Sequence, residues 1–171
     1  MRLGHRVPRD QRVSTHLALA ARALGASKMF YSGMRDPEFE ESVEKVRRNW
    51  GGNFKLEYIV DPIDFVRRVK SMGYMIIHLT MYGIPLNHIL DELLKHEKFL
   101  VIVGGEKVPS QYFYISDYNV AIGSQPHSEI SALAIFLDRI FQGVELDFQF
   151  SGGIFRVVNA KKGKYPINIK D

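Results

Sequence analysis

The sequence predicts an α/β fold in which a mainly parallel six-stranded sheet carries helices on both faces. Short apolar runs alternate with amphipathic segments along the chain, as is typical of strand–helix–strand units. Glycine or proline follows most of the apolar runs and marks the turns between elements. Because parallel neighbours need a long crossover connection, this alternation favours a parallel sheet over a series of hairpins.

Three strand–helix units are predicted in the first half of the chain. Their strands occupy residues 1–3, 28–31 and 54–60. The first helix is expected to begin at a cap formed by Ser14 or Thr15 and to end before Gly25. The second helix is expected over 36–49. The third is expected to begin at Asp61, because an aspartate cap followed by proline at the first helical position is a start signal.

The second half is predicted to contain three more strands and a terminal hairpin. The strands span residues 74–80, 99–103 and 120–122, and helices are expected over 85–95 and from Ser128 to Gly143. Beyond Gly143, alternation around the lysine-rich turn at 161–164 predicts a β-hairpin within an extension over 144–171. Because no linker interrupts the pattern, residues 1–171 are expected to form one domain.

The composition is that of an ordinary globular protein, with 46% apolar and 25% charged residues. No apolar run approaches the roughly 20 residues that span a bilayer, and the chain has no cysteine, so a cytoplasmic protein without membrane contact is expected. The six histidines lack the spacing of zinc sites, so no metal is expected. The net charge of +4 favours an anionic partner such as RNA.

Two kinds of loop are candidates for chemistry. The loop after the first strand is basic, and such cations hold phosphates or polarise a hydroxyl group. The cations in and next to this loop are Arg2, His5, Arg6, Arg9 and Arg12. Glycines at the ends of the later strands allow a planar ligand to lie against the backbone. From these residues alone, a solvated surface loop and ordinary strand–helix turns remain the alternatives.

Six motifs occur in order along nearly the whole chain. They are Arg2-Leu-Gly-His-Arg6, Arg9-Asp-x-Arg12, Ser14-Thr-His16, His78-Leu-Thr-Met-Tyr-Gly83, Gly104-Gly-Glu-Lys-Val-Pro109 and Tyr118-Asn-Val-Ala-Ile-Gly-x-Gln-Pro-His-Ser-Glu129. Together they resemble the archaeal tRNA cytidine 2′-O-methyltransferases that modify position fifty-six of the T-loop. That family belongs to the knotted SPOUT methyltransferases.

The resemblance implies a C-terminal trefoil knot, in which the end of the chain threads under an earlier loop. It also implies that S-adenosylmethionine binds in a bent form to the loops that begin at Leu79, Gly104 and Ile122. The implied cofactor contacts are Leu79, Gly104, Gly105, Glu106, Lys107, Val108, Ile122, Gly123, Ser124, Gln125, Pro126, His127, Ser128 and Glu129. A homodimer is also implied, with the last helix and the cofactor loops at the interface. The first strand of the family is slightly longer than residues 1–3.

Methyl transfer to a ribose 2′-hydroxyl requires orientation of the ribose and a lower proton affinity of the hydroxyl. An arginine beside the hydroxyl stabilises the developing oxyanion, and Arg12 and Arg22 are the candidates. His16 and His127 could serve as a base, with a structural role as the alternative for each.

The function predicted is S-adenosylmethionine-dependent 2′-O-methylation of a T-loop cytidine in tRNA. Within the same class of enzymes, the alternative is methylation of another ribose in tRNA or rRNA. A non-catalytic RNA-binding module that keeps the fold is the alternative from a different class. A general nucleotide-binding protein is disfavoured, because the chain has no phosphate-binding glycine loop.

Overall fold

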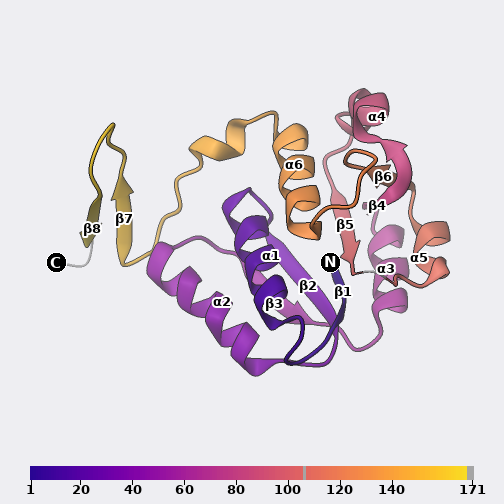
Figure 1. The fold of residues 1–171 in the computed structure, drawn as a ribbon, viewed down its shortest axis with the longest axis horizontal. Coiled ribbons are helices and arrows are strands. Elements are labelled where there is room, and N and C mark those ends of the chain that lie inside the picture. Colours follow the sequence, from indigo (N-terminus) through magenta and orange to yellow (C-terminus); the bar gives the residue numbers. More distant parts are fainter. Residues whose placement is uncertain (106, 169–171) are drawn as a thin grey trace.

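The computed structural model of the chain describes residues 1–105 and 107–168 and contains the predicted sheet (Figure 1). The strands are β1 (Arg2–His5), β2 (Lys28–Gly33), β3 (Lys55–Tyr58), β4 (Met75–Pro85), β5 (Phe99–Gly104) and β6 (Tyr118–Ala121). They lie in the order β3-β2-β1-β5-β4-β6, and all neighbouring pairs are parallel. The predicted six-stranded α/β fold is therefore confirmed, while the knot stays a prediction from the resemblance.

Helices cover both faces of the sheet, as predicted. They are α1 (Gln11–Ala23), α2 (Pro37–Trp50), α3 (Pro62–Ser71), α4 (Leu86–Leu93), α5 (Ser110–Ile115) and α6 (Glu129–Phe141). One core joins α1, α2, α4 and α6 to the sheet through buried side chains such as Leu17, Phe39 and Phe136. A second core joins α3 and α5 to the other face through Val66 and Tyr112. No helix in the described part of the chain is both long enough and apolar enough to cross a bilayer.

Of the six helices in the described residues, three, α2, α3 and α6, begin at the predicted residues. The side chain of Asp36 accepts a hydrogen bond from Phe39 N at 3.0 Å, and the side chain of Asp61 caps α3 in the same way. Ser128 Oγ accepts from Ile130 N at 3.1 Å at the start of α6. These contacts satisfy amide groups that have no partner within the helix.

The predicted start of the first helix is wrong. Helix α1 begins at Gln11, and neither Ser14 nor Thr15 caps it. Both hydroxyls lie within the helix, where Thr15 Oγ1 donates to Gln11 O at 2.9 Å and Ser14 Oγ lies 2.7 Å from His5 Nδ1. The sequence pattern favours a serine or threonine at a helix start, but here the hydroxyl of Ser14 has a partner from a different element. The short helix α5 was not predicted, because its six residues are too few to show helical periodicity.

The terminal hairpin is confirmed. After the 3₁₀ helix η1 (Val144–Asp147), strands β7 (Phe155–Val158) and β8 (Tyr165–Asn168) pair in antiparallel register. The hairpin forms a separate two-stranded sheet, and Figure 1 shows it beyond the end of α2, apart from the six-stranded sheet. Trp50 at the end of α2 and Phe155 of β7 are in contact, with ring centroids 5.8 Å apart and the ring planes tilted by 47°.

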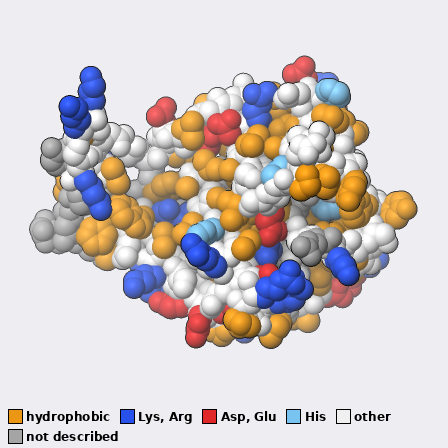
Figure 2. All heavy atoms as spheres, viewed as in Figure 1, with side chains coloured by type: hydrophobic (Ala, Val, Ile, Leu, Met, Phe, Trp, Pro, Cys, Tyr) orange, Lys and Arg blue, Asp and Glu red, His pale blue; other side chains and the backbone are white. Residues whose placement is uncertain are grey.

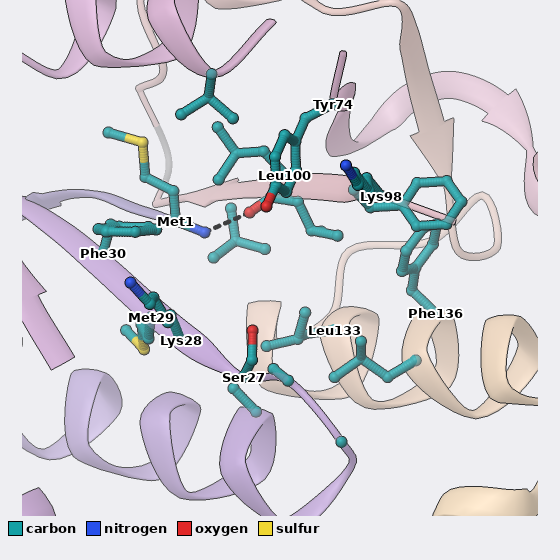
Figure 3. Close-up of a pocket in the computed structure, with 18 of the residues that line it drawn as sticks. Met1, Ser27, Lys28, Met29, Phe30, Tyr74, Lys98, Leu100, Leu133 and Phe136 are labelled. Carbon is teal, nitrogen blue, oxygen red and sulfur yellow. Dashed lines mark hydrogen bonds between the residues drawn. The ribbon is translucent and has the colours of Figure 1, made fainter. Parts of the chain in front are cut away.

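A pocket of about 580 Å³ opens at the amino-terminal edge of the sheet, where β1 is shorter than its neighbours (Figure 3). Arg2 aligns with Tyr31 of β2 and Val103 of β5. Strands β2 and β5 begin further back, at Lys28 and Phe99. The carboxyl ends of the strands lie at the opposite edge, so this pocket is separate from the loops that the sequence singles out.

Candidate active site

The candidate site lies where the strand order of the sheet reverses. Strands β1 and β5 are neighbours, but the chain leaves β1 towards β2 on one side and leaves β5 towards β6 on the other. In open parallel sheets, ligands bind beside the carboxyl ends of strands at such a point. The register pairs Leu3 with Gly104, so the basic loop and the first glycine loop begin side by side.

Asp10 gathers the arginines of the basic loop. Its carboxylate lies 3.1 Å from Arg6 Nε and 3.9 Å from both Arg9 Nε and Arg2 Nη2. Burial acts to raise the pKa of Asp10, but the hydrogen bond from Arg6 and the charges of the arginines lower the pKa below its usual value. The carboxylate therefore stays ionised and holds the loop compact.

The prediction that all five cations of this region are available to a ligand is wrong for two of them. Arg2 and His5 are buried, whereas Arg6, Arg9 and Arg12 are exposed. Arg2 is buried because it points along the sheet towards α6 rather than into solvent. The exposed basic surface of the loop is therefore made by three arginines.

A buried ion pair connects the basic loop to the last of the cofactor loops. Arg2 Nη1 lies 2.5 Å from Glu129 Oε1, and the two side chains are 3% and 17% exposed. Glu129 is the first residue of α6, so the pair fixes the start of this helix against β1. Among the described residues, neither Glu129 Oε2 nor Arg2 Nε has a hydrogen-bond partner. Glu129 Oε2 is therefore a buried acceptor without a partner among these residues, next to the loop between β6 and α6.

The three predicted cofactor loops lie at one edge of the sheet, because β5, β4 and β6 are neighbours. Strand β4 leaves its pairing after Leu79 and returns at Ile84, since both residues align with Val120 of β6. Gly83 lies within this excursion, and a Cβ placed there would be 2.4 Å from the backbone of Asn119. The excursion thus depends on a glycine for its close approach to β6.

In the glycine loop after β5, the two glycines have different surroundings. A Cβ on Gly104 would lie 2.3 Å from Val108 Cγ2, whereas a Cβ on Gly105 would meet nothing within 4 Å. Gly105 and Lys107 are exposed, and Val108 packs against the core between α3 and α5. Glu106 lies outside the described residues.

His127 fixes the shape of the loop between β6 and α6. Its Nε2 lies 2.5 Å from Ile122 O, and its Nδ1 lies 3.0 Å from Ser128 O. The imidazole therefore bridges the two ends of the loop, which agrees with the structural alternative considered for this histidine. The intervening residues Gly123, Ser124, Gln125 and Pro126 are exposed, and Gly123 has a φ of +72°.

The structure separates the two candidate catalytic arginines. Arg12 is exposed in the first turn of α1, at the carboxyl edge of the sheet, and His16 is exposed one turn further on. Arg22 is buried in the last turn, ten residues later and so about 15 Å along the helix. Its Nη2 donates to Gly51 O at 2.7 Å, and its guanidinium lies 4.8 Å from the ring centre of Phe150. Burial lowers the pKa of Arg22.

Sequence reasoning missed Asp10 and the partnership between Arg2 and Glu129. An aspartate within a loop of arginines was a usable signal, because one buried carboxylate attracts several guanidinium groups. No local pattern could identify the ion pair, because its members come from the first strand and the last helix. In the described ranges, no three histidine, aspartate or glutamate side chains gather as metal ligands do.

Comparisons with known proteins agree along nearly the whole chain. Residues 50–167 match the family model described as "tRNA ribose 2′-O-methyltransferase, aTrm56". A protein of Sulfurisphaera tokodaii is 49% identical over 94% of this chain and 95% of its own length. A protein of Methanopyrus kandleri is 47% identical over 96% of this chain and 92% of its own length. Both are named tRNA (cytidine(56)-2′-O)-methyltransferase.

Solved structures share the fold at lower identity. The TrmH/SpoU tRNA modifying enzyme of A. aeolicus has a TM-score of 0.62 at 15% identity, and the match covers 85% of this chain and 75% of that chain. The SpoU methyltransferase AviRb of Streptomyces viridochromogenes, solved in complex with AdoMet, has a TM-score of 0.56 at 17% identity. That match covers 82% of this chain and 56% of AviRb.

Proposed function

Because the chain belongs to the tRNA ribose 2′-O-methyltransferase family aTrm56, we propose that it methylates the 2′-hydroxyl of cytidine 56 in tRNA. The methyl donor is S-adenosylmethionine, as in SPOUT methyltransferases generally. The observation that carries the proposal at the level of residues is the meeting of the basic loop and the glycine loop at the β1–β5 junction. We propose the cytoplasm as its compartment, because the substrate is tRNA, and residues 1–171 as one domain.

The residues at the loop edge fit the cofactor. Gly105 has open space in front of its Cα, and the loop from Gly123 to Pro126 is exposed between two fixed ends. Glu129 Oε2, buried and without a partner in the described part of the chain, suits a hydroxyl or amino donor of the cofactor. The proposed contacts are those predicted, from Leu79, from Gly104 to Val108 and from Ile122 to Glu129. Of these, Glu106 falls outside the described residues.

When bound, the cofactor supplies a methyl group on a sulfonium leaving group. The remaining task of the protein is to place the ribose and to favour loss of the 2′-hydroxyl proton. We assign Arg12 to the 2′-oxygen, since its guanidinium is exposed at the carboxyl edge of the sheet, and Arg6 and Arg9 to neighbouring phosphates. Arg22 is not assigned a catalytic role, because it is buried at the other end of α1.

The test is methyl transfer to an unmodified archaeal tRNA transcript, with labelled S-adenosylmethionine and digestion of the product. We expect one 2′-O-methylcytidine per tRNA at cytidine 56. A matched transcript with 2′-deoxycytidine at that single position should accept no label, because it lacks the acceptor oxygen. Label at another ribose would support the alternative substrate, and binding of both ligands without turnover would support an RNA-binding module.

We also propose that the enzyme acts as a homodimer through the outer surface of α6 and the end of β4. Leu133, Phe136 and Leu137 of α6 are buried within the chain, so a partner would meet the opposite face of the helix. That face presents Ile135, which is 47% exposed. Exposed apolar side chains at the end of β4 add to the surface, which includes Met81, Tyr82 and Ile84. Figure 2 shows exposed apolar side chains on the side of the molecule where Figure 1 places β4 and α4.

Replacing Ile135 with aspartate is expected to convert the dimer to a monomer, because a charge would be buried at the centre of an apolar interface. Light scattering coupled to gel filtration at micromolar concentration measures the mass. The matched control is Ser42→Asp, which puts the same charge on an exposed position of α2. A monomeric unaltered protein, or an Ile135→Asp variant that stays dimeric, would contradict this interface.

A further inference from the structure

The imidazole of His5 is buried at the junction of three elements. The residue is 0% exposed at the end of β1, and its ring stacks on Phe39 of α2 with centroids 5.4 Å apart. Nδ1 lies 2.7 Å from Ser14 Oγ of α1, and Nε2 lies 3.1 Å from Asp36 Oδ2 at the start of α2. One side chain therefore joins the first strand to the helices that follow the first two strands.

The contacts define a complete hydrogen-bond chain. Asp36 Oδ1 accepts from Phe39 N at 3.0 Å, which leaves Oδ2 to accept from His5 Nε2–H. In the tautomer that carries its proton on Nε2, Nδ1 has a free lone pair, and the hydroxyl of Ser14 is placed to donate to it. Each buried polar atom of the three side chains has a partner in this arrangement, so the network is stable without water or a ligand.

Serine, histidine and aspartate in contact also compose a hydrolytic triad, but the burial excludes that role here. Ser14 is 0% exposed and Asp36 is 3% exposed, so no substrate can reach the serine oxygen. The network must act through what it holds in place.

What it holds is the basic loop. His5 stands immediately before the loop, and Ser14 stands one turn inside α1, just after Arg12. The 2.7 Å contact between His5 and Ser14 closes the loop at its base, and Asp10 gathers the arginines inside it. A loop with both ends fixed presents its cations in one arrangement and loses little entropy when it binds RNA.

We propose that His5 is a positioning residue for tRNA, which acts through its hydrogen bond to Ser14 to hold Arg6, Arg9 and Arg12 in their binding arrangement. This inference rests on the proposed function. It also assigns a different role to each of the two hydrogen bonds of His5. The Nδ1 contact serves RNA binding, and the Nε2 contact to Asp36 serves the stability of α2.

Two substitutions separate the two contacts. In His5→Gln, the amide nitrogen takes the place of Nε2, so the contact to Asp36 is kept and the contact to Ser14 is lost. In His5→Asn, the shorter amide takes the place of Nδ1, so the contact to Ser14 is kept and the contact to Asp36 is lost, together with the stacking on Phe39. Ser14→Ala removes the same contact as His5→Gln without altering the histidine.

Steady-state methylation of the tRNA transcript, thermal unfolding and S-adenosylmethionine binding are measured for each variant. We expect His5→Gln and Ser14→Ala to raise KM for tRNA about tenfold, with a smaller change in kcat and unchanged cofactor affinity. We expect His5→Asn to be the less stable histidine variant and yet to keep a KM close to that of the unaltered enzyme. The histidine variant with the lower melting temperature would thus have the lower KM, the opposite of what a loss of stability alone would produce.

A KM that rises in step with the loss of melting temperature would overturn the proposal, because it would show a purely structural role. An unchanged KM in both His5→Gln and Ser14→Ala would overturn it as well. Failure of the proposed function is a different result, since the unaltered enzyme itself would then leave cytidine 56 unlabelled.

Discussion

Replacement of Arg12 by alanine is expected to lower kcat for tRNA methylation by about a hundredfold or more, the usual effect of removing a group that stabilises a developing oxyanion. Arg12 is exposed in the first turn of α1, next to the strand ends that carry the glycine loops. Because it lies outside the cofactor loops, S-adenosylmethionine should bind the variant with unchanged affinity, as isothermal titration calorimetry would measure. Arg12→Lys keeps the charge but loses the planar donor geometry, so it should recover only part of the activity.

Arg22→Ala is the matched control for this prediction, because Arg22 lies on the same helix. It should lower the melting temperature, since the variant loses the hydrogen bond to Gly51 and the contact with Phe150. At a temperature where this variant is still folded, its kcat should remain close to that of the unaltered enzyme. A folded Arg22→Ala variant without turnover, beside an active Arg12→Ala variant, would reverse the assignment.

Replacement of Gly105 by valine is expected to weaken S-adenosylmethionine binding by about tenfold or more and to leave the melting temperature unchanged. A Cβ at Gly105 would meet nothing within 4 Å, and the residue is exposed, so the protein itself leaves room at this position. The added methyl groups would instead occupy the space proposed for the cofactor. Cofactor titration and thermal unfolding of the same preparation test both halves of the expectation.

Gly83→Ala gives the contrasting result. Its Cβ would lie 2.4 Å from the backbone of Asn119, which cannot move without disturbing β6. We expect a loss of about 2–4 kcal/mol in the free energy of unfolding, as for other strongly overpacked sites. If Gly105→Val destabilised the fold to the same degree, or bound the cofactor normally, the open space at Gly105 would not be part of the cofactor site.

The sequence was most informative where a signal is local. The apolar runs, most of them followed by glycine or proline, predicted the six strands, and the residues Asp36, Asp61 and Ser128 predicted three helix starts. The start of α1 was wrong because a buried histidine outside the helix competes for the Ser14 hydroxyl. Such competition depends on the packing of β1, α1 and α2, so the local sequence pattern does not reveal it.

The candidate site was predicted in the same uneven way. Glycine loops at the ends of neighbouring strands were recognisable, because glycine is favoured where backbone or ligand approaches too closely for a side chain. The burial of Arg2 could not be predicted, because its partner Glu129 is brought to it only by the complete sheet. Likewise, the burial of Arg22 could not be predicted, because it depends on how the end of α1 packs against Gly51 and Phe150.

The central position of β1 has a consequence for the order in which the chain can fold. Strand β1 is the first to leave the ribosome, and its neighbour β2 follows soon after, but its other neighbour β5 begins only at Phe99. Until β5 is synthesised, the nascent chain exposes an unpaired edge of what will become an interior strand. The long separation between the paired strands also predicts slow folding, since distant segments must meet before the sheet is complete. Biogenesis of this protein should therefore be most vulnerable to aggregation while its second half is still being translated.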